Sequence, residues 1–168
     1  MFELKPLSPE AIPGALEKAH HYRLLNEPVE AESICRDILE VDAENQDALL
    51  TLVLALSDQL EENLAPAADQ AKQALARVKD EYSRVYHTGI LCERRAKAHL
   101  KRGGPRSRHH AYDWFRQALD HYDKAAGLRP RGNDDAILRW NTCVRILKSK
   151  PELVPAPDSE EDARQWLE

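Results

Sequence analysis

Two stretches of the chain, about a hundred residues apart, repeat one pattern of small and aromatic residues. In both stretches these residues recur at helical spacing, a helix-stopping segment follows, and another helix begins. Self-similarity of this kind is typical of repeat arrays, in which helical hairpins stack on their neighbours. The first stretch contains Ala19, Tyr22, Asn26, Ala31, Ile38 and Ala43-Glu44-Asn45, and the second contains Phe115, Ala118, Tyr122, Ala125, Pro130 and Asn133.

The composition agrees with an all-α fold. Of the 168 residues, 42% are hydrophobic and 32% are charged, whereas only 6% are aromatic. This length is that of one domain with a sizeable core, and so few aromatic residues argue against a β-sandwich. We therefore expect one helical array with short terminal segments.

Turn-forming residues divide the chain into seven expected helices. The clearest breaks are Asn26-Glu27-Pro28, Asp42 to Asn45, Glu61 to Pro66 and Arg102 to Ser107. We expect Gly127 to cap the sixth helix. The first expected helix starts at Ser8-Pro9-Glu10 and runs to about residue 25. The others run over about 28–41, 46–60, 66–79, 80–101, 109–127 and 133–148.

The spacing around the sixth helix resembles that of the tetratricopeptide repeat (TPR) family. The resemblance lies in Trp114-Phe115, Ala118-Leu119, Tyr122, Ala125, Leu128 and Pro130. It implies a right-handed α-solenoid of about three helix-turn-helix repeats plus a C-terminal capping helix, with Gly89 at a small-residue position. An insertion, Lys101 to His109, departs from the family pattern. The implied divisions are an N-terminal segment 1–11, repeats 12–45, 46–79 and 82–132, the capping helix 133–148 and a flexible acidic tail 149–168.

The resemblance also implies a binding face. In this family the first helix of each repeat lines a concave surface that binds peptides. The residues mapped there are mostly apolar, which favours an amphipathic helix or a hydrophobic peptide as the partner. Two alternatives stay open, namely that these residues are core or that the chain's own tail covers them. The mapped residues are Leu16, His20, Leu50, Leu54, Tyr86, Ile90, Arg94, Ile137 and Asn141.

Basic residues are concentrated in the middle of an acidic chain. Residues 82–110 contain eight Lys and Arg and one acid, Glu93, whereas residues 1–81 contain seven basic and 17 acidic residues. This basic ridge is either a solvated or internally paired face, a contact for an acidic protein, or a site for nucleic acid or a phosphate ligand. The net charge of −5 disfavours nucleic acid. The ridge comprises Arg84, Arg94, Arg95, Lys97, Lys101, Arg102, Arg106 and Arg108.

The sequence contains no recognisable catalytic, metal or cofactor motif. Adjacent helical residues point about 100° apart, so neither His20-His21 nor His109-His110 forms a good chelate. The three cysteines are far apart and are expected to be buried free thiols of a reducing compartment. We see neither a signal peptide nor an apolar run long enough for a bilayer.

We therefore expect a cytoplasmic, non-enzymatic scaffold or adaptor that binds a protein or peptide on its concave face. Binding of nucleic acid or a phosphate ligand through the basic ridge is the alternative function. Self-association, through the tail or through opposite charges on two copies, is a further expectation about partners.

Overall fold

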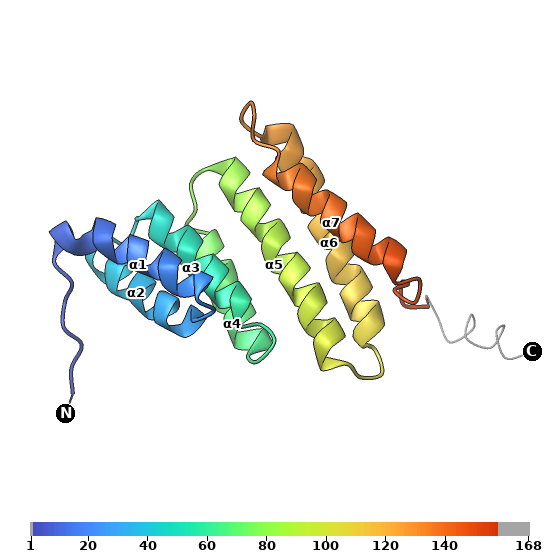
Figure 1. Ribbon diagram of the computed structural model, residues 1–168, viewed down its shortest axis with the longest axis horizontal. Coiled ribbons are helices and arrows are strands. Elements are labelled where there is room, and N and C mark those ends of the chain that lie inside the picture. Colours follow the sequence, from blue (N-terminus) through green and yellow to red (C-terminus); the bar gives the residue numbers. More distant parts are fainter. Residues whose placement is uncertain (1, 158–168) are drawn as a thin grey trace, which may run out of the picture.

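The computed structural model describes residues 2–157, and these residues form seven α-helices (Figure 1). No β-strand occurs within this part of the chain, which confirms the expected all-α class. A short 3₁₀ turn, η1 (Pro9–Ala11), precedes the first helix. The helices are α1 (Ile12–Leu24), α2 (Pro28–Val41), α3 (Gln46–Asp58), α4 (Leu64–Leu75), α5 (Glu81–Arg102), α6 (Ser107–Leu128) and α7 (Asp135–Ser149).

The helices pack in chain order. Contacts join α1 to α2, α2 to α3, α3 to α4, α4 to α5, α5 to α6 and α6 to α7, and α3 also contacts both α1 and α5. In Figure 1 the helices accordingly follow one another across the view, from α1 and α2 at one end to α6 and α7 at the other. Such sequential packing lets each hairpin bury an apolar stripe that it cannot bury alone. In the described part of the chain, no helix is both long enough and apolar enough to cross a membrane.

Capping residues explain several helix boundaries. The Asn45 side chain accepts a hydrogen bond from the Ala48 amide at the start of α3, and Asp80 accepts one from Ser83 at the start of α5. The expected cap at Gly127 is wrong. Gly127 lies inside α6, which ends one residue later, and the turn beyond the helix uses Gly132 with φ of 84°.

The hairpin of α5 and α6 is longer than its neighbours. Both helices have 22 residues, and only residues 103–106 connect them, so the expected insertion 101–109 mostly extends the two helices. Close packing at Gly89 holds the hairpin together. A Cβ atom on Gly89 would lie 2.6 Å from Cε1 of Tyr122, so only glycine allows this approach.

The core consists mainly of two clusters. One joins α1–α4 around α3, whose Leu49, Val53 and Leu56 are almost fully buried, and it also includes Leu91 and Ala98 of α5. The other joins α5–α7 around Phe115 and Tyr122, both fully buried. The apolar character of α3 on nearly all sides agrees with this central position.

The chain continues from α7 along α6. Leu153 inserts into the cluster of α5–α7 and is 5% exposed, and the backbone carbonyl of Val154 lies 3.0 Å from Nδ1 of His109. The expected tail 149–168 therefore begins with a packed segment. Its remaining part, 158–168, which includes Trp166 and Leu167, lies outside the described residues.

Candidate functional site

The expected binding residues of the N-terminal half lie on α1 and α3 with different exposures. His20 is exposed, and its Nε2 lies 3.1 Å from the Thr51 hydroxyl. Leu16, Leu50 and Leu54 are half-buried. Leu50 packs against the cluster of α1–α4, and Leu54 packs against the cluster of α5–α7. Part of this apolar set therefore serves to join the two halves of the core.

On α5 the expected residues separate into core and surface. Ile90 is 2% exposed and belongs to the core, so for this residue the core alternative holds. Tyr86 is half-buried and stacks on Tyr82, with 5.7 Å between ring centroids and nearly parallel planes. Tyr86 thereby presents an aromatic surface next to α7.

The α7 residues beside Tyr86 differ from those expected. A shallow depression of about 240 Å³ is lined by Tyr86 together with Asp135, Leu138, Arg139 and Thr142. Ile137 and Asn141 are half-buried and do not line this depression. The assignment of Ile137 and Asn141 to the binding face stays a prediction.

Arg94 is held in an ion-pair network that the sequence did not reveal. The Asp58 carboxylate pairs with Arg23 at 2.8 Å and with Arg94 at 3.1 Å. These residues lie on α3, α1 and α5, so one carboxylate connects three helices. All three side chains are partly exposed, so the network lies at the surface. We call the surface formed by α1, α3, α5 and α7, which carries Leu16, Leu50, Leu54, Tyr86 and Arg94, the odd-helix face.

A second network surrounds Glu93, the only acid of the basic stretch. Its side chain is fully buried, yet its carboxylate accepts a hydrogen bond from the Tyr122 hydroxyl at 2.6 Å. Lys97 lies 2.5 Å from the same carboxylate, and Arg139 of α7 reaches it at 3.3 Å. A buried carboxylate that is paired and hydrogen-bonded in this way remains charged.

The pKa shifts in this network follow from its geometry. Burial alone would raise the pKa of Glu93, but hydrogen bonds from Lys97 and Tyr122, together with the charges of Lys97 and Arg139, lower it. Burial and the adjacent Glu93 charge raise the pKa of Tyr122, so its hydroxyl stays protonated. The network therefore joins α5, α6 and α7 through a permanent charge at neutral pH.

Most cations of the basic ridge have partners inside the protein. Arg84 donates to the Val78 carbonyl, Arg94 pairs with Asp58, and Lys97 pairs with Glu93. Lys101 pairs with Glu61. These contacts favour the internally paired interpretation for this part of the ridge.

Arg95 is engaged with an aromatic ring. Its guanidinium carbon lies 3.7 Å from the centroid of the Trp114 ring, a cation–π contact between α5 and α6. Burial lowers the pKa of Arg95, and its Nε and Nη1 atoms are buried without a hydrogen-bond partner in the structure. Arg95 is therefore a packing residue of the hairpin.

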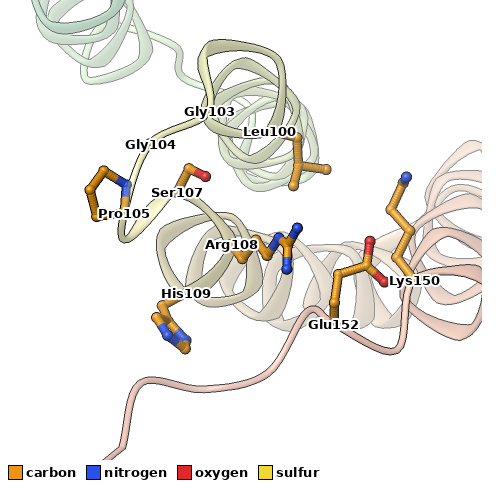
Figure 2. Close-up of a pocket in the computed structure, with 9 residues that line it drawn as sticks. All are labelled: Leu100, Gly103, Gly104, Pro105, Ser107, Arg108, His109, Lys150 and Glu152. Carbon is orange, nitrogen blue, oxygen red and sulfur yellow. The ribbon is translucent and has the colours of Figure 1, made fainter.

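The rest of the ridge lies at the turn between α5 and α6. Within residues 2–157, no carboxylate pairs with Arg102, Arg106 or Arg108, and all three are exposed. A cavity of about 590 Å³ opens beside this turn (Figure 2). In Figure 2 the Arg108 side chain points toward Lys150 and Glu152, which follow α7.

The three cysteines are free and buried. Burial raises the pKa of Cys35 and Cys143 to about 12 and that of Cys92 to about 11, so none is a reactive thiolate. Within residues 2–157, no group of three or more potential metal-ligating side chains comes together.

Comparisons with protein-family models, curated proteins and solved structures found no match to this chain. The odd-helix face and the turn between α5 and α6 are the two candidate binding surfaces.

Proposed function

We propose that this protein is a non-enzymatic scaffold or adaptor, a TPR-like α-solenoid that binds a partner peptide or helix on its odd-helix face. The observation that carries the proposal is that ion pairs connect the helices of this face from α1 to α7. Asp58 joins α1, α3 and α5, and Glu93 joins α5 to α7. A surface fixed in this way keeps its shape when it binds, which reduces the entropic cost of binding.

The side chains on the face suit a peptide more than a small molecule. Half-buried Leu16, Leu50 and Leu54 lie on α1 and α3, whereas half-buried Tyr86 and Arg94 lie on α5. The depression beside Tyr86 is shallow and holds only about 240 Å³, less than the pockets that enclose drug-sized ligands. Apolar contacts would provide affinity, and the basic ridge would steer an acidic segment of the partner.

The proposal includes a cytoplasmic location. The three thiols are unpaired and buried, which is the usual state of cysteines in a reducing compartment.

Peptides selected from a displayed random library provide a direct test. We expect binding of a selected peptide to weaken at least about tenfold, roughly 1.4 kcal/mol, in a Leu50→Asp, Leu54→Asp double variant. Because both leucines also contact the core, His20→Glu at an exposed position is a second variant that is expected to fold normally. Gln73→Glu, on exposed α4 surface, is the matched control. Unchanged binding by folded variants of the odd-helix face would refute the proposal.

A second candidate function rests on the unpaired cations at the turn between α5 and α6. Arg102, Arg106 and Arg108 would bind nucleic acid or a phosphate ligand, with the cavity of Figure 2 beside them. Titration of a short DNA duplex and of inorganic polyphosphate at several salt concentrations tests this. The triple variant replaces Arg102, Arg106 and Arg108 with Glu, and Arg116→Glu is its control. Steeply salt-dependent binding would favour the second candidate function over the first if the triple variant loses it and the control retains it.

A further inference from the structure

A groove between α1 and α2 lies outside the odd-helix face and has no role in the proposed function. It is lined by Leu7, Glu10, Ala11, Gly14, Ala15, Lys18, Ile34 and Asp37, and its volume is about 410 Å³. Its floor is mainly apolar. Gly14 adds to the open space, because nothing lies within 4 Å of the position that a Cβ atom would occupy.

The groove follows one flank of the helix pair. Ala11 at the end of η1 and Gly14 and Lys18 on α1 recur every three or four residues, and by the same spacing Leu25, the residue after α1, continues their row. On α2, Ile34, Asp37 and Val41 form the facing row. Leu25 is 56% exposed, so the row on this side ends in exposed apolar surface. The whole row from Ala11 to Leu25, of which the groove itself covers Ala11 to Lys18, is about 21 Å long, about the length of a four-turn helix.

Acidic side chains border this groove. Glu10 and Asp37 line it, and Glu40 lines an adjoining hollow that shares Leu7 and Asp37. In the part of the chain from 2 to 157, none of these three carboxylates takes part in an ion pair. The basic residues at the border are Lys5 and Lys18, and residues 1–81 as a whole carry ten more acidic than basic residues.

The outer face of α7, whose Leu138 also lines the depression beside Tyr86, carries apolar and basic residues that complement this groove. Ala136 and Cys143 face the core, whereas Leu138, on the opposite side, is 63% exposed. Arg145 and Lys148 share this outer side, are exposed, and pair with no described carboxylate. The helix has 15 residues and is therefore about 22 Å long, which matches the row from Ala11 to Leu25.

We propose that α7 of one copy of this chain docks in the groove between α1 and α2 of the next copy. Leu138 then covers the apolar floor around Gly14 and Ala15, and the cations of α7 face the acidic border. The two surfaces lie at opposite ends of the molecule in Figure 1, so each copy can use both at once. Such a contact between unlike surfaces adds copies head to tail, in an open chain or in a closed ring of more than two copies.

Two matched variants test this arrangement. Leu138→Asp removes the apolar contact of α7 and leaves the groove intact, whereas Gly14→Arg fills the groove and leaves α7 intact. Sedimentation equilibrium of the full chain, from micromolar to millimolar concentration, measures the assembly. We expect the wild-type mass to rise with concentration beyond that of a dimer, and each variant alone to remain monomeric.

Mixing the two variants provides the decisive measurement. The free groove of Leu138→Asp and the intact α7 of Gly14→Arg are expected to form a one-to-one dimer that cannot grow. Leu24→Asp, at an exposed position of α1 outside the groove, is expected to assemble as the wild type does. Circular dichroism confirms that each variant is folded.

Several outcomes would overturn the proposal. A wild-type chain that is monomeric at every concentration has no such contact. Assembly that persists in either variant alone uses other surfaces, including the opposite charges of the basic ridge. Variants that both stay monomeric when mixed, while the wild type assembles, show that α7 and the groove do not bind each other.

Discussion

Replacing Tyr122 with phenylalanine tests the role of the buried charge directly. The substitution removes one hydroxyl group and keeps the ring that packs against Gly89 and Tyr86. The lost hydrogen bond is short, 2.6 Å, and its acceptor is the fully buried Glu93 carboxylate. We therefore expect the variant to fold in the same way but to be less stable.

The magnitude follows from the geometry. A hydrogen bond to a charged group contributes about 1.5–3 kcal/mol. Because Lys97 and Arg139 still contact Glu93 in the variant, the carboxylate keeps part of its compensation. We expect the free energy of unfolding at pH 7 to fall by about 2 kcal/mol. For a chain of this size, that corresponds to a decrease in Tm of roughly 4–8 °C.

Urea denaturation followed by circular dichroism measures this change. Tyr112→Phe is the control, because Tyr112 lies on the same helix and its hydroxyl has only a long contact, 3.5 Å, with Arg116. The control is expected to differ from the wild type by less than about 0.5 kcal/mol. A Tyr122→Phe variant as stable as this control would refute the reasoning, because the hydrogen bond from the hydroxyl to Glu93 would then contribute nothing to the free energy of unfolding.

Three further predictions concern the same structure. Gly89→Ala should destabilise the fold by about 1–3 kcal/mol in urea denaturation, because the new methyl group overlaps the Tyr122 ring. The pKa of Glu93 is lowered below its ordinary value of 4.5, so its contribution is complete above that pH and is lost as the pH falls through the lowered value. An acid titration of stability should therefore show the difference between wild type and Tyr122→Phe shrinking below about pH 4.5. Ellman's reagent should react slowly with the native protein and rapidly with all three thiols in urea; fast native labelling would contradict the burial of Cys35, Cys92 and Cys143.

Local features of the fold were predictable because they depend on neighbouring residues. Helical periodicity gave the number and order of the helices, and α2 begins and ends where it was expected. Asn45 and Asp80 mark helix starts, since a side-chain oxygen there accepts a backbone hydrogen bond three residues later. Gly127 is not a cap because glycine also occurs within helices, and the sequence does not reveal its φ angle.

The candidate site was less predictable because its contacts span long distances in the sequence. Charge composition identified the basic ridge, but not that Arg94 pairs with Asp58 or that Lys101 pairs with Glu61, 40 residues away. Ile90 has the same helical register as surface residues of α5, and only the packing of α6 and α7 makes it core.

Glu93 shows most clearly what the tertiary structure decided. In the sequence it is a single acid among eight cations, which suggests a solvated residue. Its burial arises because Gly89, one helical turn earlier, lets Tyr122 approach α5, and because Arg139 arrives from α7, 46 residues away. The sequence by itself determined the helices and the caps at Asn45 and Asp80, since those interactions are local. Which charges are buried, paired or free depends on which helix faces meet, and only the packed chain brings those faces together.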